Sequence, residues 1–392
     1  MSAPGPLQPL RIFLVAGEES GDRLGAALMR ALRQRHADLS FTGVGGSEMA
    51  HEGLVSPFPI SDLAVMGFNA VARKLPLIFR RIRETAAAVA ADKPDVLVII
   101  DSPDFTHRVA RRVRKEAASI PIVNYVSPSV WAWRPGRARR MRRYIDHVLA
   151  LLPFEPEAHR RLGGPPCSYV GHPLAETASL LRPSESEAER RRADPPVLLM
   201  LPGSRAGEIK RLLGPFAKTV EAIGSTFGPL EVVIPTVPHL EAVLRKETRD
   251  WEKPPCIVIE AKEKQAAFRM ARAALAKSGT VTLELAVAGV PMVTAYKVTA
   301  FEAPIVRRMI KAPSAILANL VLGENVVPEF MQEDCTVENL TKALLPLLSD
   351  SPERQGQLDA FARLDAVMEI GLAHPSARAA EIVLREARRA SG

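Results

Sequence analysis

Short apolar runs separated by helix-period segments recur along the whole chain, and this alternation limits the possible folds more than any other feature. Strands buried on both faces of a parallel sheet read as short, continuous apolar runs. When such runs alternate with helices, they predict parallel sheets covered by helices on both faces. We expect strands at residues 11–16, 40–44, 96–100, 122–126, 148–152, 197–201, 231–234, 256–259, 273–276 and 291–294.

The break in this pattern falls between Pro173 and Pro195, where the polar segment 184–194 precedes two prolines. Polar, proline-bounded stretches are typical of exposed connections between domains. The sequence therefore predicts an α/β fold with two Rossmann-like domains whose parallel sheets face each other across a cleft. We expect an N-terminal domain at 1–175, a C-terminal domain at 195–350 and further helices at 351–392.

The net charge of +8 arises entirely in the first half of the chain. Residues 1–173 contain 24 Lys and Arg against 16 Asp and Glu, whereas residues 174–392 contain 28 of each. A basic half suits a polyanion or an anionic membrane surface, although a merely soluble basic surface has the same composition. The three cysteines are far apart, so neither a zinc site nor a disulfide framework is expected. No apolar run approaches the ~20 residues that span a bilayer, and no signal peptide is expected.

Two strand-to-helix turns in the second half are suited to anions. One apolar run ends in Pro202-Gly203-Ser204-Arg205, and another ends in Lys277-Ser278-Gly279-Thr280. Free N–H groups at a helix N-terminus bind phosphate, and the Arg205 guanidinium can hold two of its oxygens. Glu284 lies one turn further on, where it could accept two hydrogen bonds from a ribose. The alternatives are that Arg205 pairs with a local carboxylate and that Thr280 caps its helix beside an exposed Glu284. Two such turns in one domain favour a nucleotide diphosphate.

Polar residues also follow strands in the first half. The segment Gly17–Asp22 lacks the G-x-G-x-x-G fingerprint of dinucleotide-binding folds, but Glu18 and Ser20 are placed to bind a polar ligand. We expect Asp22 to cap the helix that follows. Asp101 ends the apolar run 96–100, where a buried carboxylate can act as a general base, the alternative being a structural aspartate that holds the loop. Asp104 follows a proline and is expected to be the N-cap of the next helix.

Two segments combine basic residues with apolar or aromatic ones. Residues 63–83 place apolar side chains beside Arg and Lys, which is typical of a segment in a membrane interface and also of any helix packed on a sheet. Pro76 argues against one regular helix there. Residues 127–143 combine Trp131 and Trp133 with clustered arginines, a composition that suits RNA, lipid headgroups or a substrate phosphate. Without a recognised nucleic-acid fold, no nucleic acid is expected as a partner.

Several short motifs, taken in order, resemble those of the lipid-A-disaccharide synthases, bacterial glycosyltransferases that help to make the outer-membrane lipid anchor. They are AGEESGD, LAVMG, IDSPDF, YVSPSVWAWR, LPFE, GHPLA, LPGSR, SGTVTLE, PMV-x-x-Y and N-x-x-x-G-x-x-x-x-P-E-x-x-Q. The resemblance runs from about residue 11 to residue 335 and is most specific in YVSPSVWAWR.

The resemblance implies a GT-B fold and an inverting transfer that needs neither metal nor cofactor. The donor would be UDP-2,3-diacylglucosamine and the acceptor 2,3-diacylglucosamine 1-phosphate, attacked through its 6-hydroxyl. The products would be the β-1,6-linked disaccharide 1-phosphate and UDP. It also implies an N-terminal domain that faces the acceptor and the anionic inner membrane, peripheral binding on the cytoplasmic face of that membrane, and C-terminal helices that return to the first domain or are exchanged in a homodimer.

Carried over residue by residue, the resemblance makes Asp101 the general base and Glu18 and Ser20 part of the acceptor-side loop. It assigns the UDP part to Arg205, Ser278, Gly279, Thr280, Glu284 and Asn319. Ala318 and Glu324 depart from the usual proline and arginine around the asparagine segment, and an inward-pointing Glu324 would weaken diphosphate binding. Lys277 stands where a small residue is common and could add a phosphate contact.

Two other interpretations stay open at this point. One is another UDP-sugar enzyme of the same fold, such as a UDP-N-acetylglucosamine 2-epimerase, which would not need a lipid-facing patch. The other is a non-enzymatic RNA-binding protein that uses the arginines of residues 134–143. The anion-binding turns and Asp101 favour an enzyme, because an RNA-binding protein needs neither.

Overall fold

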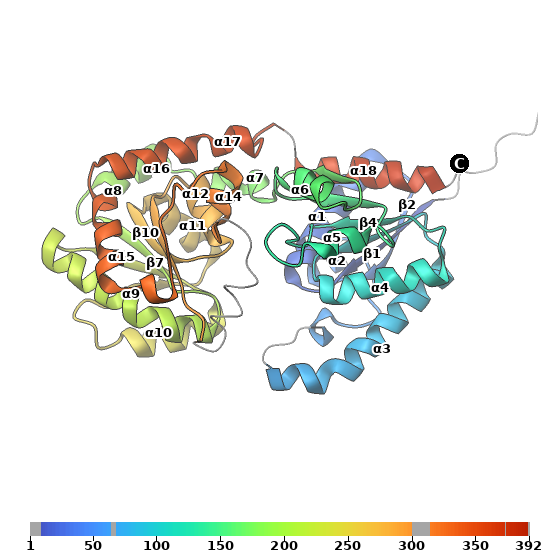
Figure 1. Cartoon of the computed structure of the whole chain (residues 1–392), viewed down its shortest axis with the longest axis horizontal. Coiled ribbons are helices and arrows are strands. Elements are labelled where there is room, and N and C mark those ends of the chain that lie inside the picture. The colour runs from blue at the N-terminus through green and yellow to red at the C-terminus, as the bar shows by residue number, and fades with distance from the viewer. Residues whose placement is uncertain (1–8, 64–67, 300–313, 373, 391–392) are drawn as a thin grey trace, which may run out of the picture. The chain divides into compact units, whose positions relative to one another are not determined.

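The computed structural model describes residues 9–63, 68–299, 314–372 and 374–390, and its chain forms two compact units (Figure 1). Unit 1 comprises Met1–Pro173 and Leu372–Gly392, and unit 2 comprises Leu174–Gly371. Each unit contains one parallel six-stranded sheet covered by helices. In the described ranges no helix is both long and apolar enough to cross a membrane.

The sheet of unit 1 has the strand order β2-β1-β3-β4-β5-β6. Its strands are β1 (Leu10–Ala16), β2 (Leu39–Val44), β3 (Val96–Ile100), β4 (Ile122–Tyr125), β5 (His147–Ala150) and β6 (Cys167–Tyr169). Successive side chains of a strand point to opposite faces, so β1 contributes to two cores. Leu14 packs in a core with residues of α1 (Glu19–Arg35) and α18 (Pro375–Ala390), whereas Val15 packs in a core with residues of α3 (Phe68–Asp92) and α4 (Pro103–Glu116).

The sheet of unit 2 has the strand order β12-β11-β10-β7-β8-β9. Its strands are β7 (Val197–Leu201), β8 (Glu231–Pro235), β9 (Cys256–Val258), β10 (Ala273–Lys277), β11 (Met292–Tyr296) and β12 (Glu329–Met331). Leu198 and Met200 of β7 pack in a core with Phe216 of α9 (Ala206–Phe227) and Leu340 of α15 (Val337–Leu344).

Other α-helices lie within the described residues. They are α2 (Ser47–His51), α5 (Gly136–Met141), α6 (Glu155–Arg161), α7 (Leu174–Thr177), α8 (Glu185–Arg192), α10 (Glu241–Thr248), α11 (Ala261–Met270), α12 (Val281–Val287), α14 (Leu317–Leu322), α16 (Pro352–Ala362) and α17 (Leu364–Val367). The last helix of the chain, α18, packs against α1, the first (Figure 1).

The predicted α/β class is confirmed, and a strand is present at each of the ten predicted apolar runs. Two edge strands, β6 and β12, were not predicted, because each has only 3 residues and no distinct apolar run. The expectation about Pro76 is wrong: α3 continues through it as one helix of 25 residues. Residues 64–67, within the basic and apolar segment, lie outside the described residues.

Strand register brings the predicted turns of each unit to one edge of its sheet. In unit 1, Ala16 pairs with Ile100 and Ile100 pairs with Tyr125, so the turns after β1, β3 and β4 leave the sheet side by side. In unit 2, Ala276 pairs with Leu201, so the turns after β7 and β10 are also neighbours. Ligands of parallel α/β sheets bind at these carboxyl ends.

Candidate active site

Asp101 and Ser20 meet at the carboxyl edge of the unit 1 sheet. Ser20 Oγ donates a hydrogen bond of 2.9 Å to Asp101 Oδ2, and the Ser102 N–H donates one of 2.8 Å to Asp101 Oδ1. The Asp101 side chain is half-buried. The structure thus joins the general base and one acceptor-side residue that the sequence predicted, because each follows a strand that pairs with the other's.

The backbone that carries Asp101 is strained. Asp101 has φ 52° and Ser102 has φ 45°, both in the left-handed region that residues other than glycine rarely adopt. Each such residue costs on the order of 1–3 kcal/mol and persists only where its surroundings impose it. Here Thr106 Oγ1 donates to the Asp101 carbonyl across 2.7 Å. Gly17 lies close against Ser102 in this turn, and a Cβ on Gly17 would be only 2.7 Å from Ser102 Cβ.

Three other acidic side chains near this edge have different surroundings. Asp104 is not the N-cap of α4: Ser102 occupies that position, Pro103 follows it, and the Asp104 side chain is 93% exposed. Asp22 is structural, as expected, but it caps a different helix: its carboxylate accepts from the N–H groups of Gly46, Glu48 and Met49, at the start of α2. Glu18 is the N-cap residue of α1 and is exposed.

A buried carboxylate that the sequence reasoning missed fixes the loop after β4. Glu155 accepts the indole N–H of Trp131 at 3.1 Å and the N–H groups of Leu151 at 3.1 Å and Leu152 at 3.0 Å. Burial nevertheless raises the pKa of Glu155 to about 7. The LPFE motif pointed to this position, because it places a glutamate directly after an apolar run.

Unit 2 contains a cavity of about 330 Å3 at the carboxyl edge of its sheet. Its lining residues come from the ends of β7, β8 and β10 and the turns after them, from α9, α11 and α12, and from the short 3-10 helix Ala178–Leu181: Leu181, Leu201, Gly203, Ser204, Glu208, Pro235, Thr236, Val237, Lys264, Gln265, Phe268, Lys277, Gly279, Thr280, Val281 and Glu284. Three residues predicted to bind the UDP part, Gly279, Thr280 and Glu284, are therefore in one cavity. Arg205 and Ser278 adjoin lining residues in the sequence.

Glu208 organises the turn after β7. Its buried carboxylate accepts the Ser204 N–H at 3.0 Å and lies 3.4 Å from Arg205 Nη1. The local-carboxylate alternative for Arg205 is thus present in the structure, but the Arg205 side chain is 77% exposed and its fork is free to turn toward an anion. Gly203 is required because its φ is 125° and a Cβ would lie 2.4 Å from Glu208 Oε2.

The turn after β10 differs in one detail from the expectation. The Ser278 N–H is not free, since it donates to the Ala295 carbonyl at 3.0 Å and so continues the sheet. Within the described residues the Gly279 and Thr280 N–H groups donate to no backbone carbonyl. Thr280 is the N-cap residue of α12, but its side chain makes no capping bond. The buried hydroxyls of Thr236 and Ser278 have no hydrogen-bond partner among the described residues, and Thr236 lines the cavity.

The alternative interpretation places Glu284 in solvent, but its side chain is not exposed in the structure. It lines the cavity, and burial raises the pKa of its carboxyl, while the charge of Lys264 opposes this shift. A carboxylate at a cavity wall can accept hydrogen bonds from the hydroxyls of a sugar. The position of Glu284 is consistent with that role.

Asn319 has a different environment from the other predicted UDP-binding residues. Its buried side-chain amide accepts the N–H groups of Val326 and Val327 and donates to the Val327 carbonyl at 3.0 Å. Its side chain thus holds the loop before β12, and the cavity lining does not include it. Glu324 pairs with Arg363 at 2.9 Å, and this pairing lowers the pKa of the Glu324 carboxyl.

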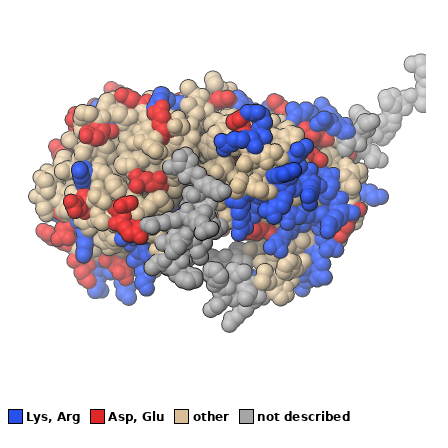
Figure 2. Space-filling model, viewed as in Figure 1, with Lys and Arg blue, Asp and Glu red and all other residues tan. Residues whose placement is uncertain are grey.

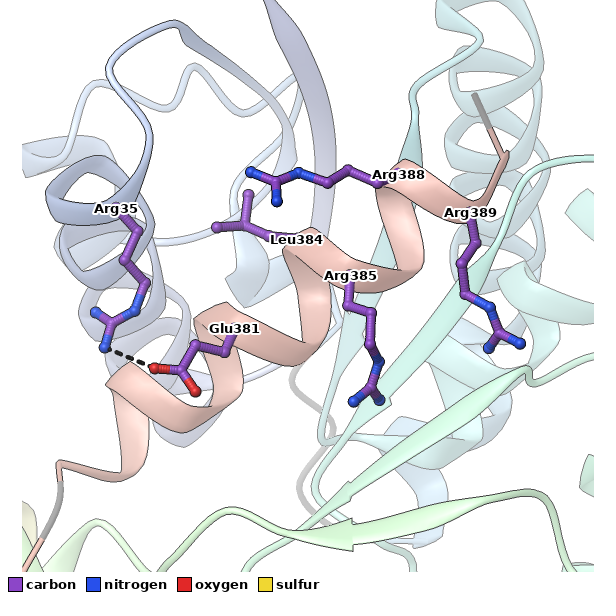
Figure 3. A pocket seen from close by; sticks show the side chains of 6 residues that line it. All are labelled: Arg35, Glu381, Leu384, Arg385, Arg388 and Arg389. Atoms are coloured by element: carbon purple, nitrogen blue, oxygen red, sulfur yellow. Dashed lines mark hydrogen bonds and ion pairs between the residues drawn. The ribbon is translucent and has the colours of Figure 1, made fainter. Parts of the chain in front are cut away.

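Another cavity lies on unit 1 between α1 and α18 (Figure 3). It is lined by Arg35, Glu381, Leu384, Arg385, Arg388 and Arg389, and Arg35 pairs with Glu381 at 3.2 Å. None of the predicted site residues lines it. Across the described ranges no three His, Cys, Asp or Glu side chains are grouped so that they could hold a metal ion.

Comparison with known proteins identifies the family. The sequence model of the lipid-A-disaccharide synthetase family matches residues 12–383. The chain belongs to this family. It is 63% identical over 375 residues to the lipid-A-disaccharide synthase of Nitrobacter hamburgensis, covering 95% of each chain. It is 61% identical over 380 residues to that of Rhodopseudomonas palustris, covering 97% of each chain. This family match favours the synthase interpretation over the epimerase.

Solved structures of lower similarity confirm the GT-B type of fold. The UDP-GlcNAc 2-epimerase of Neisseria meningitidis, bound to UDP-GlcNAc, has a TM-score of 0.62 at 13% identity, with coverage of 96% of this chain and 100% of that one. MurG of Acinetobacter baumannii has a TM-score of 0.58 at 15% identity, with the same coverage. At such identities the likeness concerns the fold alone.

Proposed function

We propose that the protein transfers 2,3-diacylglucosamine from its UDP derivative to the 6-hydroxyl of 2,3-diacylglucosamine 1-phosphate, with inversion. The observation that carries the proposal is the unit 2 cavity, where two strand-to-helix turns and Glu284 surround a space suited to a nucleotide. Family membership and a related fold that binds UDP-GlcNAc in another enzyme support it.

Unit 1 supplies the base in this proposal. Asp101 takes the proton of the acceptor 6-hydroxyl as the oxygen attacks the anomeric carbon of the donor. The new C–O bond forms while the bond between that carbon and the diphosphate breaks, and UDP leaves with the electron pair. Ser20 holds the carboxylate of Asp101 in a fixed orientation through its 2.9 Å hydrogen bond. Glu18, at the start of the same helix, is assigned to the acceptor side.

Unit 2 binds the leaving nucleotide. The charge that develops on the diphosphate is stabilised by fixed donors and not by reorganising water, which is the most effective form of electrostatic catalysis. Arg205 and the N–H groups of Gly279 and Thr280 supply those donors, and Glu284 accepts from the ribose hydroxyls. Ser278 ties its turn to the sheet through its N–H, while Asn319 holds the loop before β12.

We further propose that unit 1 contacts an anionic membrane surface. Leu75 and Phe79 of α3 are 40% and 48% exposed, and the Arg108 guanidinium lies 5.4 Å from the Phe79 ring centre. Basic side chains of unit 1 gather on the face seen in Figure 2. Exposed apolar residues beside basic ones suit a peripheral protein on anionic lipid. Sedimentation with anionic vesicles tests this, and Phe79→Ser should weaken it.

UDP release in detergent tests the proposed reaction. Both diacylated glucosamine lipids are supplied in one reaction, and the acceptor 1-phosphate is left out of a second. The transferase requires release that depends on both lipids and a disaccharide that appears in equal amount. Release with the donor alone would instead identify a hydrolase.

A further inference from the structure

Lys277 ends β10 with its ammonium group at the wall of the unit 2 cavity. Its side chain is 19% exposed. The Nζ atom lies 3.4 Å from the place that a Cβ of Gly279 would occupy and 5.3 Å from the ring centre of Tyr296. The cation therefore stands over the turn whose Gly279 and Thr280 N–H groups donate to no backbone carbonyl among the described residues.

Glu208, in the first turn of α9, fixes this ammonium. Its Oε1 atom lies 3.3 Å from Lys277 Nζ and 3.4 Å from Arg205 Nη1, while Oε2 accepts the Ser204 N–H at 3.0 Å. The carboxylate thus gathers a backbone N–H, a guanidinium and an ammonium, which are the groups that proteins use for phosphate. Two cations and one carboxylate leave a net positive charge at this wall.

We propose that Lys277 binds the phosphate groups of the UDP-sugar donor and that Glu208 positions it for this contact. The inference rests on the proposed function and adds a second cation to the Arg205 guanidinium and the N–H groups at the two turns. A lysine is well suited here, since the compact ammonium can contact oxygens of either phosphate without the fixed geometry of a guanidinium. Held by Glu208 and Tyr296, it loses little further side-chain freedom when the donor binds.

Lys277 and Lys264 both line the cavity, but their carboxylate neighbours differ. The charge of Lys264 acts on Glu284 and opposes the rise that burial causes in the pKa of that carboxyl. Glu208, by contrast, lies within ion-pair distance of two cations, Lys277 and Arg205. A diphosphate entering the cavity therefore meets an uncompensated positive charge at the Lys277 wall.

Calorimetric titration of uridine, UMP and UDP into the full chain tests the inference. The variants are Lys277→Gln and Lys277→Ser, with Lys218→Gln as a matched control that removes one exposed lysine of unit 2 outside the cavity lining. We expect both Lys277 variants to weaken UDP binding about ten- to hundredfold and to leave uridine affinity unchanged, because a charge-assisted hydrogen bond to phosphate is lost. Lys218→Gln should bind all three ligands as the wild type does.

Two results would overturn this inference and leave the proposed function unaffected. One is UDP affinity in both Lys277 variants equal to that of the wild type. The other is an equal loss for uridine and UDP, which would make Lys277 a residue that only maintains the cavity. Thermal melting of each variant shows whether it folds. If one Lys277 variant does not fold, the UDP affinity of the other variant tests the inference. A wild-type protein that binds no UDP would instead refute the proposed function.

Discussion

Ser20 Oγ donates to Asp101 Oδ2 across 2.9 Å, and this bond joins the first strand-to-helix turn of the chain to the third strand of the sheet. Ser102 N–H holds the other carboxylate oxygen. One hydrogen bond to each oxygen leaves the carboxylate able to accept from a substrate hydroxyl, since an ionised carboxylate can accept about four hydrogen bonds.

Asp101→Asn should abolish transfer and leave UDP binding largely unchanged. The amide is nearly isosteric but cannot take a proton, and general base catalysis contributes about a hundred- to ten-thousandfold. The loss should appear in kcat for disaccharide formation, with UDP affinity measured by calorimetry as the control. Turnover close to that of the wild type would remove Asp101 as the base and favour its structural interpretation.

Ser20→Ala should lower kcat by about three- to thirtyfold. The carboxylate of Asp101 would lose one of its two short hydrogen bonds but keep its backbone contacts, so the effect should be that of a single charge-assisted bond. UDP affinity should not change, because Ser20 belongs to unit 1 and the cavity lies in unit 2. Ser20→Thr retains the hydroxyl and is the matched variant. If it is as impaired as Ser20→Ala, the hydroxyl is not the relevant group.

Arg205→Ala should weaken UDP binding by about ten- to hundredfold, as expected for losing a forked contact with phosphate. The side chain is 77% exposed and its ion pair with Glu208 is long, so its removal should hardly alter the thermal stability of the protein. Arg205→Lys should recover only part of the affinity, because an ammonium lacks the planar fork. Affinities for UDP and UMP measured by calorimetry give both comparisons, and unchanged UDP affinity in Arg205→Ala would contradict the assignment.

Glu155→Gln should remove a pH dependence of stability. Burial raises the pKa of Glu155 from 4.5 to about 7. Between these values the folded protein keeps a proton that the unfolded chain has released, so the free energy of unfolding falls as pH rises through this window. The full difference is roughly 3 kcal/mol. Denaturant unfolding at pH 4.5, 6 and 8 measures it.

The exposed Glu157 supplies the control for that experiment. It lies two residues from Glu155, and its ion pair with Arg160 lowers the pKa of its carboxyl. Ionisation of Glu157 should therefore not make the protein less stable as pH rises from 4.5 to 8. Glu157→Gln should therefore keep the wild-type decline, and Glu155→Gln should show a smaller one. Parallel curves for the wild type and Glu155→Gln would contradict the assigned shift.

Residues close together in the sequence were easier to predict than contacts between distant segments. The positions of Asp101 and the Gly279–Thr280 turn could be predicted because each follows an apolar run, and parallel sheets align such positions. Glu284 could be placed because it lies one helical turn beyond that second loop. The role of Glu208 could not, because it depends on Lys277 lying on a neighbouring strand. Glu155 was missed for the same reason: its partner Trp131 is 24 residues away.

Three local predictions were wrong or incomplete because the same residues suit more than one local conformation. Asp104 and Ser102 both suit an N-cap, and the strained turn at Asp101 selects Ser102. Ser278 could end its strand or begin the next turn, and pairing with β11 takes its N–H. In α3, burial of Ile82 and Val89 outweighs the hydrogen bond that Pro76 removes.

The position of α18 sets the order in which the protein can fold during synthesis. Unit 2 is inserted between the two parts of unit 1, and Val383 and Leu384 complete the core against α1. The sheet of unit 1 leaves the ribosome first, yet the residues that cover one of its faces are translated last. Unit 2 can be native while that face is still open to water and to other chains. A stop codon before α18 would leave unit 2 intact and make unit 1 a target for chaperones and proteases.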